Sequence, residues 1–162
     1  GTQLEFMMED VERRGLAENF VFTGALHGEA MLAALGAADI CVSPDPKNAM
    51  NDISTMNKVI EYMLLAKPIV QFDLKEGRYS ASDASLYAKA NDPIDFAAQV
   101  ARLVDDPDLR ARLGQTGRTR AINALSWEHS APHLLAAYDR AFAALTGKAK
   151  RRVEAEAHHV SG

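Results

Sequence analysis

Several residue types and patterns are scarce or missing in this sequence of 162 residues, and each absence excludes a class of protein. Cys41 is the one cysteine, so neither an intrachain disulfide nor a cysteine-based metal cluster can form. The apolar runs fall far short of the roughly 20 residues that a membrane-spanning helix needs. The first residues contain neither a basic region nor an apolar core, so we predict no signal peptide.

A surplus of positive charge is also missing, because 18 Lys and Arg residues face 22 Asp and Glu residues and the formal net charge is −4. A mildly acidic chain is a poor candidate for a general nucleic-acid binder, so we expect no nucleic-acid partner. The HExxH, GxSxG and GxxxxGKS/T motifs are absent as well. Nothing in the sequence therefore supports a zinc protease, a serine hydrolase or a P-loop NTPase.

The composition that is present fits a folded domain. Hydrophobic residues make up 48% of the chain and charged residues 25%, which excludes disorder over most of its length. Short β-rich apolar segments predict strands over residues 20–23, 40–42, 69–72 and 86–88. Apolar residues at helical spacing predict helices over residues 3–14, 28–38, 55–66, 93–104, 108–125 and 127–145.

These strands are unbroken apolar runs, which is typical of a parallel sheet covered on both faces. We therefore predict an α/β fold, a doubly wound parallel-sheet Rossmann-like domain with helices at its C-terminal end. So few strands leave a long open edge, so we expect the domain to be incomplete at its N-terminus. We predict one domain over residues 1–146 and a disordered tail over 147–162, which lacks apolar periodicity.

The candidate site follows from this fold, because open parallel sheets bind ligands at the carboxyl ends of their strands. The longest polar loop at such an end leads into the helix expected to begin at Thr55. Ser54, Lys58 and Glu61 then share one helix face. The N–H groups at the helix start attract anions such as phosphate, and Lys58 adds a positive charge. Glu61 can accept hydrogen bonds from the two hydroxyl groups of a ribose.

A plainer interpretation stands beside this one. Lys58 and Glu61 are three residues apart, so they can form an ordinary surface ion pair that contributes a few tenths of a kcal/mol, roughly 0.2–0.5. Spacing alone favours that surface pair. The wider sequence pattern favours the ligand site.

Several segments together carry a family resemblance: NFVFTGAL, AADICVSP, NKVIEYMLLAKPIVQFD, LVDDPDLRARLGQTGRTRA and LSWE. In order and spacing over residues 19–138, they resemble the C-terminal half of family 4 glycosyltransferases. Those enzymes have two facing Rossmann-like domains, the GT-B arrangement. The resemblance implies that a nucleotide-sugar donor binds here as substrate, that sugar is transferred with retention, and that no metal or cofactor is needed.

The resemblance also assigns residues. Glu61 matches the glutamate that binds the donor ribose, and Glu76 matches a loop position near the donor. The residues that match positions beside the diphosphate are Ser54, Thr55, Met56, Asn57 and Lys58.

Two positions depart from the family pattern. Where the family has a first glutamate, this sequence has Ile53, and the adjacent Asp52 is the candidate substitute. The glycine that is usual before Lys-Pro is Ala66, which costs about 1 kcal/mol if the backbone there has a positive φ.

The resemblance implies that the chain is the nucleotide-sugar-binding part of a retaining glycosyltransferase and is inactive alone. Its partner is the N-terminal acceptor domain of the same parent chain, and its location is cytoplasmic, with the inner membrane face as a possible peripheral site. Two alternatives stay open, a non-catalytic α/β module that binds a protein and a nucleotide-sugar epimerase of the same architecture. An open cleft lined by Ser54, Lys58 and Glu61 favours donor binding, whereas a flat, solvated surface favours the module.

Overall fold

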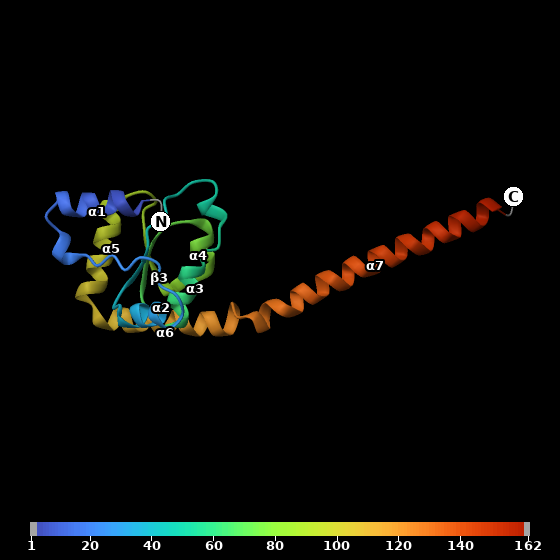
Figure 1. Ribbon diagram of the computed structural model, residues 1–162. Helices are drawn as coiled ribbons and strands as arrows, with labels where there is room; N and C mark the ends of the chain where they lie inside the picture. The colour runs from blue at the N-terminus through green and yellow to red at the C-terminus, as the bar shows by residue number, and fades with distance from the viewer. Residues whose placement is uncertain (1–2, 161–162) are drawn as a thin grey trace. The chain divides into compact units, whose positions relative to one another are not determined.

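The computed structural model describes the backbone of residues 3–160 and the side chains as far as Thr146 (Figure 1). Residues 1–37 and 38–162 form two compact units, which we describe separately. All of the predicted site residues belong to the second unit. Within the described residues, no helix has the length and apolar character that crossing a membrane requires.

The first unit contains the two helices that the periodicity predicts. They are α1 (Leu4–Arg13) and α2 (Gly28–Ala37), with the short 3-10 helix η1 (Ala17–Asn19) between them. Asp10 pairs with Arg13 and Arg14 at the end of α1, and Val11 is the buried residue of that helix.

The strand predicted over residues 20–23 does not form, and this prediction was wrong. Phe20 has the extended dihedral angles of a strand, with φ of −123° and ψ of 135°. However, no residue of this segment belongs to the sheet of the described chain, and Val21 is 88% exposed. A strand needs a hydrogen-bonded neighbour, and the β propensity of Phe and Val does not supply one.

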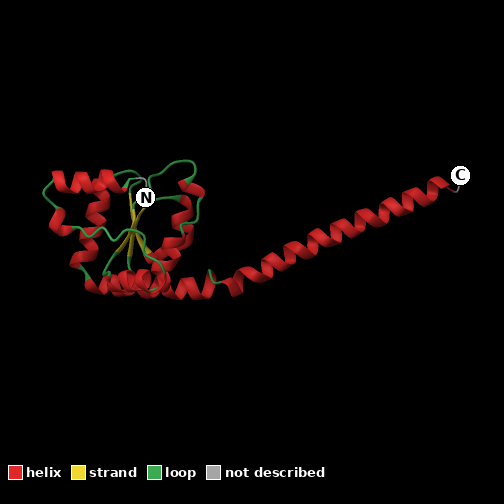
Figure 2. Ribbon diagram, viewed as in Figure 1, coloured by secondary structure: helices red, strands yellow, loops and turns green. Residues whose placement is uncertain are grey.

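The second unit is built on a parallel sheet of three strands in the order β1-β2-β3 (Figure 2). The strands are β1 (Cys41–Ser43), β2 (Ile69–Phe72) and β3 (Ser85–Ala88). Val70 lies opposite Val42 on one side and Leu86 on the other. Because the strands are parallel, their last residues lie at the same end of the sheet. This end, formed by Ser43, Phe72 and Ala88, is named the carboxyl edge.

Helices cover both faces of this sheet, which confirms the doubly wound α/β prediction. The helices of this unit are α3 (Asn57–Leu64), α4 (Lys75–Ala81), α5 (Pro93–Asp105), α6 (Pro107–Ala124) and α7 (Trp127–Val160), of which α7 extends away from the sheet (Figure 1). Ile69 packs with Met63 of α3, whereas the next residue, Val70, packs with Leu103 of α5. Successive residues of a strand point to opposite faces, so β2 joins both halves of the core.

Apart from shifts of one or two residues at helix ends, the helices differ from the predictions in three main places. α3 begins at Asn57 rather than Thr55, and a short 3-10 helix η2 (Asn51–Ile53) precedes it. The segment expected to be a loop over residues 73–82 contains α4, followed by the 3-10 helix η3 (Ser82–Ala84). α7 continues past its predicted end at residue 145. The disorder predicted for the tail over 147–162 has no test in these helix bounds, and it stays a prediction.

The starts of α5 and α6 follow the sequence signals closely. Asp92 caps α5 by accepting hydrogen bonds from the N–H groups of Ile94 and Asp95, and Pro93 occupies the first helical position. Asp106 caps α6 in the same way through Leu109. Pro at the first helical position after an Asp cap is a strong local signal, which explains why both boundaries were predicted to within a residue.

Candidate functional site

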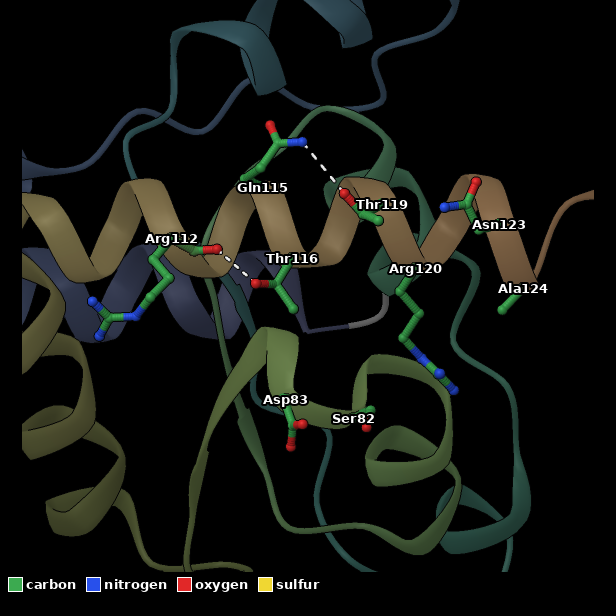
Figure 3. A pocket seen from close by; sticks show the side chains of 9 residues that line it. All are labelled: Ser82, Asp83, Arg112, Gln115, Thr116, Thr119, Arg120, Asn123 and Ala124. Carbon is green, nitrogen blue, oxygen red and sulfur yellow. Dashed lines mark hydrogen bonds between the residues drawn. The ribbon is translucent and has the colours of Figure 1, made fainter.

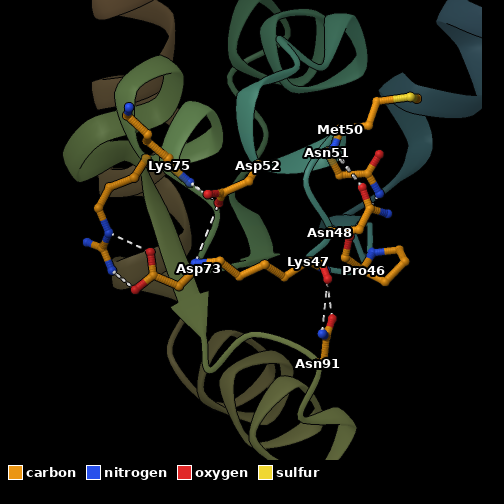
Figure 4. Close-up of polar contacts among 10 residues, drawn as sticks. Pro46, Lys47, Asn48, Met50, Asn51, Asp52, Asp73, Lys75 and Asn91 are labelled. Carbon is orange, nitrogen blue, oxygen red and sulfur yellow. Dashed lines mark hydrogen bonds and ion pairs between the residues drawn. The ribbon is translucent and has the colours of Figure 1, made fainter.

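The loop between β1 and α3 is held at the carboxyl edge by its own polar side chains. Asn48 Oδ1 accepts hydrogen bonds from two backbone N–H groups that follow it, at 3.0 and 2.8 Å. Asn91, which follows β3, accepts from the N–H of Lys47 at 2.7 Å and donates to its carbonyl oxygen at 3.2 Å (Figure 4). The loop is therefore fixed to the chain segments at the ends of two different strands.

Asp52 supports the start of α4. Its Oδ1 accepts a hydrogen bond of 2.9 Å from the backbone N–H of Lys75, and it forms an ion pair of 3.5 Å with Lys47 Nζ (Figure 4). The hydrogen bond from Lys75 is the main cause that lowers the pKa of the Asp52 carboxyl. Asp52 thus joins the loop to α4, and its predicted contact with a sugar stays a prediction.

Lys58 pairs with Asp45 and not with Glu61, so the surface-pair interpretation was wrong. Lys58 Nζ lies 2.7 Å from Asp45 Oδ2 and 2.8 Å from Oδ1, and Ser43 Oγ donates a 2.5 Å hydrogen bond to the same carboxylate. Burial raises the pKa of Asp45, but the hydrogen bonds from Lys58 and Ser43 outweigh it and leave the pKa below its ordinary value. The sequence prediction missed Asp45, although its place directly after a strand was a usable signal.

Glu61 lies on α3 one turn after Lys58 and is exposed. The buried residues Val59 and Met63 occupy the opposite face of the helix. Among the described residues, no hydrogen bond or ion pair engages the Glu61 carboxylate. Its acceptor oxygens are therefore open to a ligand.

The residues just before α3 do not belong to the helix, which corrects the prediction that Ser54 shares a helix face with Lys58 and Glu61. Ser54 has an extended backbone, and its Oγ donates a 2.6 Å hydrogen bond to the carbonyl of Met50. The local 3-10 helix η2 takes up this part of the chain and delays the start of α3. Ser54 therefore stands beside the helix start and contributes no helical N–H.

Met56 is the N-cap residue of α3, and its side chain makes no capping hydrogen bond. It packs instead against the core around Val59 and Met63, so a donor contact through the Met56 side chain has no support. Asn57, the first helical residue, is exposed. The first N–H groups of α3 therefore have no side-chain acceptor from the cap, which is the arrangement that receives an anion.

Thr55 and Glu76 come together although they are far apart in the sequence. Thr55 Oγ1 donates a 2.9 Å hydrogen bond to Glu76 Oε1, which links the approach to α3 with the first turn of α4. Glu76 is half-buried, and its predicted place near the donor stays a prediction. Of the predicted site residues, Thr55, Lys58, Glu61 and Glu76 thus all surround the start of α3 or its first two turns.

Comparison with known families decides what kind of chain this is. The sequence profile described as "Glycosyl transferases group 1" matches residues 2–106, which is more than half of the chain. The chain belongs to this glycosyltransferase family. Comparison with curated protein sequences gave no match.

A solved structure supports the fold of this glycosyltransferase chain. Sucrose-phosphate synthase from Thermosynechococcus elongatus superposes with a TM-score of 0.74 at 22% sequence identity. The match covers 89% of this chain and 35% of that chain, so this chain spans about a third of the synthase. The likeness shows a shared Rossmann-like fold of the kind found in half of a GT-B glycosyltransferase, and it says nothing of substrate.

Glu61 and Lys58 of the glycosyltransferase lie on an open surface. A cavity of about 390 Å³ lies beside the Thr55–Glu76 contact, lined by these two residues together with His129 and His133 from the first turns of α7. Ser54, Lys58 and Glu61 do not line it. The two cavities of the described residues that lie in this unit are thus not lined by Ser54, Lys58 or Glu61, which favours the protein-binding alternative over donor binding.

A larger cavity lies far from the carboxyl edge. Its volume is about 580 Å³, and its walls are η3 and one polar face of α6, from Arg112 to Ala124 (Figure 3). Because η3 directly precedes β3, this cavity is at the amino ends of the strands, opposite the predicted site. No residue that the sequence analysis selected lines it, and we assign it no role.

Beside the candidate site, α4 is fastened to the sheet by Arg78. Its guanidinium donates to both oxygens of Asp73 at 2.7 and 2.6 Å and lies 4.1 Å above the ring of Tyr87. Burial raises the pKa of Tyr87 to about 12, and the Tyr87 hydroxyl donates to the carbonyl of Ser82 at 2.7 Å. The described residues contain no group of three or more His, Cys, Asp or Glu side chains arranged to hold a metal.

Proposed function

We propose that this chain is the nucleotide-sugar-binding part of a retaining glycosyltransferase. One observation carries the proposal: the exposed and unengaged carboxylate of Glu61 lies one turn after Lys58, on a helix whose start has no side-chain cap. This helix begins at the carboxyl edge of a parallel sheet, where such folds bind their ligands. Membership of the glycosyltransferase family supports a diphosphate-linked sugar as that ligand.

In the proposed arrangement, the donor diphosphate lies over the first N–H groups of α3, next to Lys58. The ribose hydroxyl groups donate hydrogen bonds to Glu61. As the bond to the sugar breaks, negative charge grows on the departing nucleoside diphosphate, and the helix start and Lys58 stabilise it. Ser54, Asn57 and the Thr55–Glu76 pair border this position.

The wider enzyme is also part of the proposal. We propose an acceptor domain in the same parent chain, no transfer of sugar by this chain alone, and no requirement for a metal or cofactor. A cytoplasmic location, with peripheral contact at the inner membrane face, and assignment to family 4 belong to the same proposal. Asp52 can take the place of the family's first glutamate only if it gives up its hydrogen bond with the backbone N–H of Lys75.

The proposal is tested by titration calorimetry of the chain with UDP, GDP and ADP. We expect one of the three to bind, and Glu61→Ala to weaken that binding about tenfold or more, because two hydrogen bonds to a charged group are lost. Glu12→Ala, which removes an exposed carboxylate of α1, is the matched control and leaves the affinity unchanged.

A protein-interaction module is the second candidate, and the open surface around Lys58 and Glu61 favours it. That candidate predicts no nucleotide binding by this chain or by a longer form of its parent. If the longer form also binds none of the three nucleotides, the donor-site proposal is contradicted. If a nucleotide binds and Glu61→Ala does not weaken that binding, only the assignment of Glu61 to the site is contradicted.

A further inference from the structure

Asp45 holds the ammonium group of Lys58 in place. Both carboxylate oxygens lie within hydrogen-bond distance of Lys58 Nζ, at 2.7 and 2.8 Å. Ser43 Oγ donates a 2.5 Å hydrogen bond to the same carboxylate, and Ser43 is buried at the end of β1. The sheet therefore holds Asp45, and Asp45 in turn holds the ammonium group beside the start of α3.

The same contact cancels much of the positive charge that Lys58 brings. Two other cations at the carboxyl edge, Lys47 and Arg78, are balanced in the same way. Lys47 pairs with Asp52 at 3.5 Å, and the guanidinium of Arg78 pairs with a carboxylate at 2.6 Å. An anion next to Lys58 thus gains from the helix start and from the hydrogen bonds of Lys58, and less from its net charge than an unpaired lysine would give.

Donor and product of a glycosyltransferase differ in charge at the terminal phosphate. In a nucleotide sugar that phosphate is esterified, and the diphosphate carries about two negative charges. In the free nucleoside diphosphate the terminal phosphate ionises a second time with a pKa near 6, so the product carries about three charges at pH 7. Any site with a surplus of positive charge favours the product.

We propose that Asp45 is a specificity-determining residue that holds Lys58 and keeps the site from retaining the free nucleoside diphosphate. This inference rests on the proposed function, because it takes the terminal phosphate to lie next to Lys58. The carboxylate repels the third charge of the product more than it repels the two charges of the donor. Asp45 therefore narrows the advantage in affinity that product has over donor.

The test compares two dissociation constants in Asp45→Asn. The probes are UDP with UDP-glucose, GDP with GDP-mannose and ADP with ADP-glucose, and the pair that binds the unaltered chain is used. We expect Asp45→Asn to shift the ratio of affinities towards the free diphosphate by about threefold to tenfold, from one unit charge a few ångströms away in a largely solvated site. Raising the salt to about 1 M shrinks this shift.

Two control variants separate charge from structure. Asp39→Asn makes the same change of formal charge just before β1, at the opposite edge of the sheet, and leaves the ratio unchanged. Ser43→Ala removes the hydrogen bond from Ser43 to Asp45 without changing charge. It can lower the affinity for both probes but leaves the ratio of the two affinities unchanged. A ratio shift in Ser43→Ala that equals the shift in Asp45→Asn overturns the inference.

The outcomes also distinguish this inference from the proposed function. If binding depends on Glu61 while Asp45→Asn changes both affinities equally, the inference is wrong and the donor site stands. If none of the probes binds to the chain or to a longer form of its parent, both fail. A shift of the affinity ratio that occurs in Asp45→Asn and in neither control variant supports both the inference and the proposed function.

Discussion

Ala66 occupies a backbone conformation that suits glycine better than alanine. Its φ is +53°, at the position directly after α3 and its cap residue Leu65. The N–H of Ala66 donates to the carbonyl of Met63, and the N–H of Lys67 donates to the carbonyl of Tyr62. This pair of hydrogen bonds is the Schellman motif, which needs a left-handed residue in its first position after the helix.

Replacing Ala66 with glycine is expected to stabilise the chain. The substitution Ala66→Gly removes the clash of a Cβ atom in the left-handed region and raises the free energy of unfolding by about 1 kcal/mol. Urea denaturation measures the free energy of unfolding. Ala111→Gly is the control in which the same substitution is expected to have the opposite effect. Ala111 lies on the exposed face of α6, where glycine is expected to cost about 1 kcal/mol. An equal loss in both variants would contradict the strain at Ala66.

The sequence selected Glu61 and Lys58 as candidate site residues, and their spacing left a surface ion pair between them as the plainer alternative. The spacing of three residues predicts a pair with each other, whereas in the structure Lys58 Nζ reaches Asp45. That contact joins residues 13 apart in sequence and exists only because β1 ends beside α3. A helical spacing rule covers contacts within one helix and therefore cannot report a partner from another element.

A close approach between two elements joins α6 to the end of α3. A Cβ atom placed on Gly114 would lie 2.0 Å from the carbonyl oxygen of Ala66. One turn of α6 further on, a Cβ atom on Gly117 would lie 3.2 Å from Cγ of Met63. Glycine at these two positions lets the backbones of α6 and α3 approach, and this packing fixes the end of the helix that carries Lys58 and Glu61.

A methyl group at position 114 is expected to disrupt this contact. The substitution Gly114→Ala puts Cβ against a backbone oxygen that no side-chain rotation can move away, so it lowers the free energy of unfolding by about 3 kcal/mol. Thermal unfolding monitored by circular dichroism measures the change. Gly36→Ala, in the last turn of α2, meets no atom within 4 Å and serves as the control. A loss as large in that control would show that the helical glycines themselves, and not the contact with Ala66, decide stability.

Elements with strong local signals were predicted well, and elements that depend on distant partners were not. Asp-Pro at the starts of α5 and α6 defines both starts to within one residue. In contrast, the N–H of Lys75 at the start of α4 bonds to Asp52, which is 23 residues away. The segment 20–23 shows the converse case, because its β-rich residues have no neighbouring strand in the described sheet.

The two compact units of the molecule differ in how much apolar surface they bury. Within the described residues 3–37, Val11 is the one buried side chain. In residues 38–162, Met63, Ile69, Val70 and Leu103 are completely buried. Burial of apolar surface is the main favourable contribution to folding, so most of the stability resides in the unit that carries Lys58 and Glu61.

This difference predicts unequal protection against hydrogen exchange. Amides of β2 lie in the centre of the sheet and are expected to exchange only through global unfolding, whereas amides of α1 and α2 exchange through smaller openings, at least about tenfold faster. Exchange followed by mass spectrometry of peptides measures both. Added urea at low concentration is expected to speed β2 exchange steeply and α1 exchange only slightly, because global opening exposes more surface. Equal rates with equal urea dependence would mean that residues 1–37 unfold only together with the sheet.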